Sequence, residues 1–326
     1  MIRTRICDVL GIEHPIALGG MPTLFNSAEL VSAVSAAGGL GILGCTHLDT
    51  SQIEKCARDI RTLTNRPFAL NALVFFDDWE GYEAAVAERP AVVSLSWPRK
   101  DQDVARWIDH AHSVGSKVTY MAGDVAEAVR GAEAGADVIV AQGTEGGGHV
   151  GWMATSVLVP MIVDAVAPVP VMAAGGIADG RGLAAALCLG ADGVLLGTRF
   201  LASKECGLHP NFKNAIVESN GEDTVLTEIP DIAASQVWPG AMSRAKWNRF
   251  VERWAGREWA LRQNIAAVAE EIAAARREGD AEEAPLFYGQ DAGLITDLPP
   301  AAEIIGRMVD EAEELISRRL PNLMSA

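Results

Sequence analysis

One stretch of the chain places an ionisable imidazole directly after backbone that has almost no side-chain bulk. Residues 141–151 read AQGTEGGGHVG, and His149 is the titratable residue. Glycines let the backbone approach a ligand closely, while a histidine titrates near neutral pH and can transfer a proton. The same pattern also occurs in ordinary surface turns. Its place in the fold therefore has to decide whether His149 is a catalytic residue.

Two further glycine-rich stretches follow apolar runs later in the chain. Residues 174–182 read AGGIADGRG and residues 197–199 read GTR. Backbone N–H groups in such loops, together with a helix N-terminus, can bind a phosphate group. Tight turns between strands and helices are the alternative explanation. We predict that both stretches, through Gly175, Gly176, Gly197 and Thr198, bind one phosphate.

The first two hundred residues alternate short apolar runs with longer amphipathic segments, as βα units do. Eight runs are predicted to be strands, namely 14–17, 40–44, 67–74, 91–97, 117–122, 137–143, 170–176 and 193–200. Predicted helices between them include 27–37, 50–63, 103–114, 125–134 and 180–189. Eight repeats are the number that closes a (β/α)₈ barrel, in which chemistry lies at the carboxyl ends of the strands. The fold class predicted is therefore α/β, a TIM barrel, with the His149 loop after the sixth strand.

A doubly wound sheet is the rival topology, and it would carry a phosphate-binding glycine loop after its first strand. Residues 19–21 (GGM) occupy that place but lack the G-x-G-x-x-G pattern. From residue 209 the pattern becomes helical, and apolar residues recur at helical spacing. We predict a barrel domain over 1–208, a smaller helical domain over 209–284 that covers the substrate pocket, and a return segment over 285–326. The final helix is expected to bury Ile304, Ile305, Met308, Val309, Ala312, Leu315 and Ile316.

Bulk composition excludes several classes of partner. The formal net charge of −16 argues against nucleic acid and against an anionic membrane surface. Neither a signal peptide nor a membrane-spanning run is predicted, and the five scattered cysteines suit free thiols in a reducing cytoplasm. Neither cysteines nor histidines show metal-ligand spacing, so no metal site is predicted. The oligomeric state is left open.

Several fragments in one order along the chain resemble the FMN-dependent nitronate monooxygenases, once called 2-nitropropane dioxygenases, and the related FMN-dependent enoyl-acyl-carrier-protein reductases. The fragments are 15–21 (PIALGGM), 37–41 (AGGLG), Asn71, 142–149 (QGTEGGGH), 174–180 (AGGIADG), 197–200 (GTRF) and 289–294 (GQDAGL). Each fragment alone is weak, and their common order is what makes the resemblance strong. It covers nearly the whole chain.

The resemblance implies a barrel that binds FMN, with small-molecule substrates and with O2 or NAD(P)H as co-substrate. His149 matches the active-site histidine on the substrate side of the flavin. Cofactor contacts are implied for Gly20, Met21, Asn71, Gln142, Gly147, Gly148, Gly175, Gly176, Gly197, Thr198 and Gln290. Met121 stands where relatives commonly offer a polar side chain near the flavin, which removes one hydrogen bond to the cofactor.

Three functions follow as hypotheses. The first is oxidation of an alkyl nitronate, or of a nitroalkane, by O2 to a carbonyl compound and nitrite. The second is NAD(P)H-dependent reduction of an enoyl thioester or a quinone, in which reduced FMN delivers hydride. The third is a binding module without turnover. The physiological substrate and the choice between NADH and NADPH do not follow from the residues.

Overall fold

A single parallel sheet forms the centre of the molecule. The computed structural model describes residues 2–23 and 25–324. The strands follow the order β1-β10-β9-β7-β6-β5-β4-β3-β2, and every pair is parallel. Their bounds are β1 (Ile16–Leu18), β2 (Met21–Pro22), β3 (Gly41–Gly44), β4 (Phe68–Leu73), β5 (Val92–Ser96), β6 (Lys117–Ala122), β7 (Val138–Gln142), β9 (Val171–Ala174) and β10 (Gly193–Leu196).

The sheet curls and closes on itself. Its first strand is interrupted at Gly19 and Gly20, so that β1 pairs with β10 while β2 pairs with β3. Ala17 also bridges to Leu40 in parallel, just before β3. If β1 and β2 are counted as two parts of one strand, the strands of this sheet correspond to the eight apolar runs of the sequence. The predicted TIM barrel is confirmed.

Alternation along each strand divides the core into two layers. In β7, Val138 and Val140 pack in the cluster inside the barrel, while Ile139 and Ala141 pack in the cluster beneath the helices. Strands buried on both faces need apolar residues at every position, which explains the continuous apolar runs. The helices around the barrel are α1 (Arg5–Leu10), α2 (Ala28–Ala36), α3 (Thr50–Leu63), α4 (Trp79–Ala87), α5 (Val104–Ser113), α6 (Val125–Glu133), α7 (Thr155–Val166), α8 (Gly180–Cys188) and the short α9 (Thr198–Leu201).

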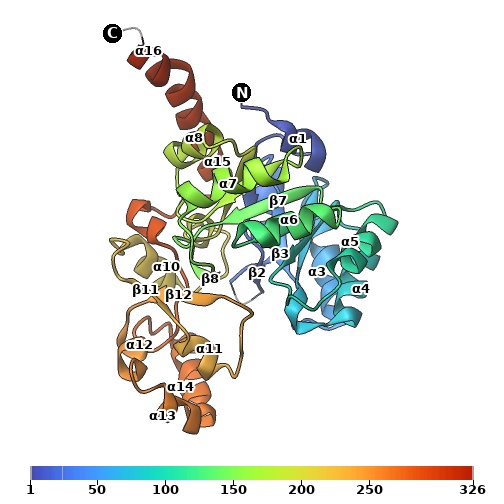
Figure 1. Cartoon of the computed structure of the whole chain (residues 1–326). Coiled ribbons are helices and arrows are strands. Elements are labelled where there is room, and N and C mark those ends of the chain that lie inside the picture. The colour runs from blue at the N-terminus through green and yellow to red at the C-terminus, as the bar shows by residue number, and fades with distance from the viewer. Residues whose placement is uncertain (1, 24, 325–326) are drawn as a thin grey trace.

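Beyond α9 the chain builds a second layer below the barrel in Figure 1, which we call the cap. Its elements are α10 (Pro210–Val217), β11 (Thr224–Thr227), α11 (Ile229–Ala233), β12 (Met242–Lys246), α12 (Arg249–Trp254), α13 (Glu258–Gln263) and α14 (Ile265–Glu278). This segment was expected to be helical, and it also contains β11 and β12. Each of these strands is short, so its alternating pattern cannot be distinguished in the sequence from helical spacing. They form an antiparallel sheet with β8 (Gly148–Val150), which comes from the His149 loop.

The chain then returns to the barrel through a 3₁₀ turn (Gln290–Leu294) and α15 (Ala301–Glu314), which packs against α8. The predicted apolar face of this last helix is buried from Ile304 to Ala312. Ile316 is exposed instead, because a π-helical turn (Leu315–Arg319) changes the helical phase before α16 (Leu320–Met324).

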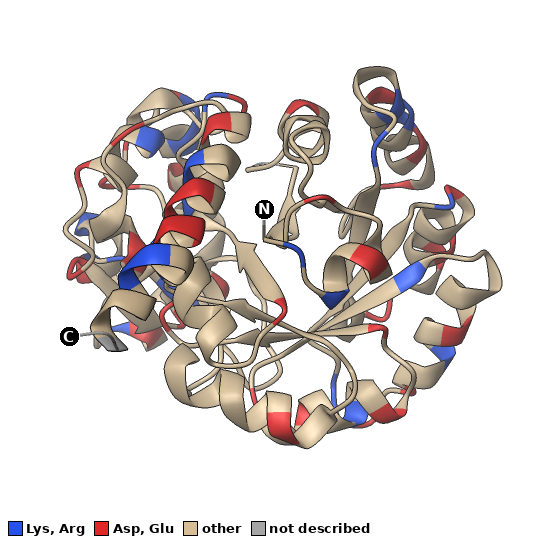
Figure 2. Cartoon of the chain, turned by 90° about the horizontal axis from the view of Figure 1, so that it is seen from above, with Lys and Arg blue, Asp and Glu red and all other residues tan. Residues whose placement is uncertain are grey.

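Charged side chains lie mainly on the outer helices and loops, where acidic and basic residues are interspersed (Figure 2). The excess of 43 acidic over 27 basic residues makes the molecule strongly anionic as a whole. No helix in the described part of the chain is long and apolar enough to cross a membrane.

Candidate active site

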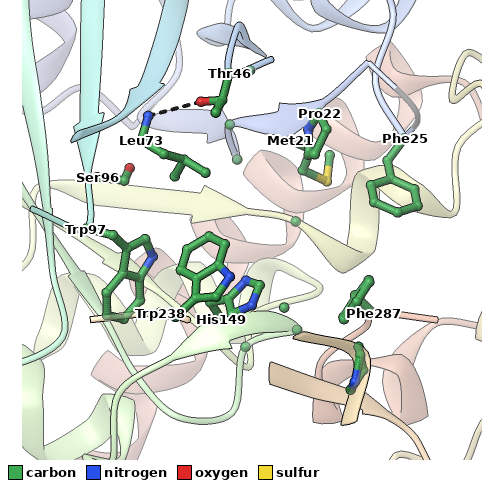
Figure 3. A pocket seen from close by; sticks show the side chains of 18 of the residues that line it. Met21, Pro22, Phe25, Thr46, Leu73, Ser96, Trp97, His149, Trp238 and Phe287 are labelled. Carbon is green, nitrogen blue, oxygen red and sulfur yellow. Dashed lines mark hydrogen bonds between the residues drawn. The ribbon is translucent and has the colours of Figure 1, made fainter. Parts of the chain in front are cut away.

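A cavity of about 500 Å³ lies at the carboxyl ends of the barrel strands, between the barrel and the cap. Loops after the strands form one wall, and α11 and α14 of the cap contribute to the other. Most of the lining is apolar, with a few polar groups, as in cofactor and substrate sites. Figure 3 shows its aromatic part, where Trp97, Trp238 and His149 lie side by side and Phe287 lies apart from them, with its ring centroid 6.3 Å from that of His149.

The structure brings nearly all of the predicted site residues to this cavity. Those that line it are Gly20, Met21, Asn71, Gln142, Gly147, Gly148, His149, Gly175, Gly176, Gly197 and Thr198, together with Met121. Gln290 is the exception. Its side chain is exposed, and its N–H donates to the Glu145 carbonyl oxygen at 2.9 Å. The 3₁₀ turn that begins at Gln290 directs the next residue, Asp291, to the cavity instead.

The two loops predicted to bind phosphate meet at one end of the cavity. Gly175 and Gly176 have φ angles of +97° and +74°, which glycine adopts at least cost. A Cβ atom on Gly175 would lie 2.6 Å from the Gly143 carbonyl oxygen, whereas one on Gly197 would meet no protein atom within 4 Å. In the described chain, the N–H groups of Gly176 and Thr198 donate to no other residue. Open space beside free N–H groups suits an anionic group of a ligand.

Polar groups of the barrel also face the middle of the cavity. The Asn71 amide nitrogen donates to the Ser94 and Ser96 hydroxyls at 3.2 and 3.1 Å, which fixes the side chain beside Gly20. The Gln142 amide oxygen is buried, and among the described residues it has no hydrogen-bond partner. A buried acceptor without a partner is costly, so a ligand that donates to it would stabilise this arrangement.

His149 is held by two residues of the cap. Its Nε2 atom lies 2.7 Å from Asp231 Oδ1 and 2.9 Å from Ser243 Oγ, and the Ser243 hydroxyl donates to Asp231 Oδ2 at 2.9 Å. The Ser243 hydroxyl has one hydrogen, which it donates to Asp231. The hydrogen that joins the imidazole to Asp231 and Ser243 is therefore carried by Nε2 of His149. Nδ1 is then the ring nitrogen that carries no hydrogen in the neutral imidazole.

Strand pairing explains how these residues meet. His149 pairs with Ser243 in the β8–β12 register, and Asp231 lies in α11, which precedes β12. Asp231 and Ser243 are both buried, so solvent competes little for these hydrogen bonds. Trp238, from the loop between α11 and β12, stacks on the imidazole with ring centroids 3.3 Å apart and an angle of 10° between the planes. Figure 3 shows the two rings against each other at the cavity wall.

The residues that surround His149 come from the cap, and the sequence did not predict them. These residues are Asp231, Ser243 and Trp238. They lie 82 to 94 residues from His149 along the chain, and no motif connects them to it. His47, Arg276 and Asp291 also line the cavity without having been predicted. The clearest signal in the sequence is that tryptophans recur after Asp231, at 238, 247, 254 and 259. Contacts over such separations depend on tertiary structure.

Asp291 is an ionisable group that lines the cavity beside Thr198 of the predicted phosphate loops. Burial raises the pKa of its carboxyl from its ordinary value of 3.8 to about 7, against a smaller opposing effect of a hydrogen bond with Thr198. Its Oδ1 atom is buried and has no partner among the described residues. Thr198 in turn accepts the Gly289 N–H at 2.9 Å, which links the return segment to the barrel.

A closed parallel barrel, a glycine-lined cavity at its carboxyl edge and an oriented histidine define a barrel enzyme with a small-molecule site. The family model for nitronate monooxygenase matches residues 3–311. The chain belongs to this family, which consists of flavin-dependent oxidoreductases.

Relatives in the family carry several different activities in their names. A (3aS,4S,5R,7aS)-5-hydroxy-7a-methyl-1-oxo-octahydro-1H-indene-4-carboxyl-CoA dehydrogenase of Mycobacterium tuberculosis is 33% identical, covering 95% of this chain and 96% of its own length. A probable nitronate monooxygenase of Staphylococcus aureus is 30% identical, covering 96% of this chain and 98% of its own length.

Solved structures agree with this assignment. FabK from Thermotoga maritima superposes with a TM-score of 0.87 at 34% identity, covering 99% of this chain and 100% of that one. A nitroalkane oxidase from Streptomyces ansochromogenes superposes with a TM-score of 0.81 at 26% identity, covering 96% of this chain and 99% of that one. The fold is therefore shared by family members with different named activities.

Proposed function

We propose that this protein binds FMN in the cavity and oxidises an alkyl nitronate with O2, yielding a carbonyl compound and nitrite. The observation that carries the proposal is the orientation of His149 by Asp231 and Ser243 at the wall of a glycine-lined cavity. Bound FMN would supply the electron transfer. Every other contribution comes from residues of the chain.

The barrel wall would hold the cofactor. Gly197 offers the phosphate group open space, Gly176 and Thr198 offer free N–H groups, and Gly175 forms the turn of the same loop. Gln142 offers a buried acceptor, and Asn71 a fixed amide. Met121 lines the cavity with a thioether, so at that position it offers neither a charge nor a strong hydrogen-bond donor to the flavin.

His149 would manage the proton. With Nε2–H directed to Asp231, the neutral ring can accept at Nδ1 the α-proton of a nitroalkane, which converts it to the nitronate. The protonated ring, with the Asp231 carboxylate beside it, can instead hold a nitronate by charge. Trp238 covers one face of the ring and excludes water from it.

Anaerobic spectral titration of the purified protein tests the proposal. We expect the flavin absorbance to bleach on addition of propyl-2-nitronate and to stay unchanged with NADH or NADPH. Bleaching by a nicotinamide alone would contradict nitronate oxidation. A protein that copurifies without flavin and takes up no FMN would contradict the cofactor assignment.

A second function is supported by the size and chemistry of the cavity. Its lining continues beyond the His149 region to the cap residues Ala269, Ile272 and Arg276, farther than a small nitronate needs. Two relatives are named for chemistry on a carboxyl-CoA compound. The alternative is thus an NAD(P)H-dependent flavin reductase of enoyl thioesters or quinones, with His149 protonating or orienting the substrate. Rapid bleaching by NADH or NADPH in the same titration would favour it.

A further inference from the structure

One cation in the cap wall of the cavity has no counter-charge. Arg276, on α14, is half-buried and lines the cavity. Within residues 2–23 and 25–324 its guanidinium makes neither a hydrogen bond nor an ion pair with the protein. Burial lowers its pKa, and no carboxylate lies close enough to offset this. A desolvated charge without a partner destabilises the fold, and the place of Arg276 in the last turn of α14 offsets this only in part.

Other buried arginines of the molecule are paired. Arg199 donates to the Ala202 and Asp297 carbonyl oxygens at 2.8 and 2.7 Å and forms an ion pair with the Asp297 carboxylate. Arg244 donates to the Thr144 carbonyl oxygen at 2.9 Å and to the Thr224 hydroxyl at 3.1 Å. Arg276 differs from both because it lines the cavity and has no protein partner among the described residues. The comparison indicates that its partner is a ligand.

The surroundings of Arg276 leave room for such a ligand. Ala269, Ile272 and Ala273 line the cavity from the same face of α14, at the spacing of successive helical turns. Their side chains are apolar and two of them are small. Among the described residues that line the cavity, Arg276 is the only lysine or arginine. It belongs to the cap, whereas the loops proposed to bind the FMN phosphate belong to the barrel.

We propose that Arg276 binds a phosphate group of an elongated ligand that extends from the flavin to the cap. The guanidinium fork matches phosphate oxygens in a bidentate manner. Two sources share this chemistry, namely a substrate carried on coenzyme A and a nicotinamide co-substrate. This inference rests on the proposed flavin site, and it extends that site by a second anion subsite.

Binding titrations on the oxidised FMN-loaded protein test the subsite without requiring turnover. The probes are free coenzyme A, NADH and NADPH, followed by calorimetry. The variant is Arg276→Gln. The control is Arg277→Gln, which removes the same charge from an exposed neighbouring position of α14. Loss of charge-assisted hydrogen bonds predicts roughly 10- to 100-fold weaker binding for Arg276→Gln, and no change for Arg277→Gln.

The probe whose binding is weakened in Arg276→Gln identifies the source of the phosphate. Weakening for coenzyme A alone assigns the subsite to the substrate, and weakening for a nicotinamide alone assigns it to the co-substrate. Equal affinities of wild type and Arg276→Gln for all probes, or no measurable binding to the wild type, would overturn the proposal. So would a loss of FMN affinity in Arg276→Gln, because Arg276 would then serve the cofactor.

Thermal unfolding gives a second readout that a structural role would not produce. Removing an unpaired desolvated charge should raise the Tm of Arg276→Gln and of Arg276→Met above that of the wild type. A lower Tm in both variants would mean that Arg276 supports the fold, which contradicts the proposal. Nitronate titration of the wild type tests the proposed oxidation separately, so the two proposals can fail independently.

Discussion

The two walls of the cavity are built on different principles. The barrel wall consists mostly of glycines and small side chains at strand ends, where backbone N–H groups face the cavity. The cap wall carries an ionisable and aromatic set, with Asp231, Trp238 and Arg276. The comparison suggests that the barrel wall binds the cofactor and the cap wall determines the substrate.

His149 lies where the two walls join. Its strand β8 leaves the barrel after β7 and pairs with β12 of the cap. A single residue therefore belongs to the barrel loop by sequence and to the cap by hydrogen bonding. Substitutions on the two sides should accordingly separate cofactor binding from turnover.

The largest effect is expected for His149→Asn. Loss of a general acid–base group lowers turnover by roughly 10²- to 10⁴-fold. FMN content should stay at the wild-type level, because the phosphate loops are untouched. Steady-state rates measure turnover, and the ratio of flavin absorbance to protein absorbance measures FMN content. Unchanged rates with both nitronate and nitroalkane would remove His149 from the mechanism.

Asp231→Asn should lower turnover less than His149→Asn does. A hydrogen bond to a charged group contributes about 1.5 to 3 kcal/mol, which corresponds to roughly 10- to 100-fold in turnover. Ser243→Ala is the matched variant, and loss of its neutral bond should cost only a few-fold. Equal effects of the two variants would mean that charge plays no part.

Two glycines of the barrel wall make a paired test of cofactor binding. Gly197→Ala places a methyl group where no protein atom lies within 4 Å, so Tm should stay unchanged while FMN affinity falls. In Gly147→Ala the methyl group would lie 2.4 Å from the Tyr288 backbone. Overpacking of this kind costs about 1 to 3 kcal/mol of stability. Full FMN affinity in Gly197→Ala would contradict the phosphate site.

The smallest effect on turnover is expected for Asp291→Asn, which changes stability with pH. The folded-state pKa of Asp291 is raised to about 7 from 3.8. Its neutral form contributes stability that is fully present below pH 3.8 and is lost as the pH rises through about 7. The Tm of the wild type should therefore fall relative to that of Asp291→Asn between pH 5 and pH 8. Parallel Tm curves over this range would contradict the raised pKa.

Local patterns were sufficient for the barrel and for its own wall. Strands such as β4 and β7 are buried on both faces, so their apolar runs identify them without any knowledge of their neighbours. The order of the strands then places the loops that follow them on one edge. For this reason the glycines at 175, 176 and 197 and the imidazole of His149 could be assigned to one cavity in advance. Local patterns did not locate the cavity residue in the return segment. We predicted Gln290 at this position, but the 3₁₀ turn that begins at Gln290 places the next residue, Asp291, in the cavity lining.

The sequence by itself therefore determined the barrel, its catalytic edge and the family, since these follow from periodic burial and from contiguous motifs. Tertiary structure alone decided what surrounds His149. The pairing of β8 with β12 brings Ser243 and Asp231 to the imidazole, and the α11–β12 loop brings Trp238 onto its face. These contacts join residues about ninety positions apart. Their geometry depends on how the cap packs on the barrel, which no local pattern encodes.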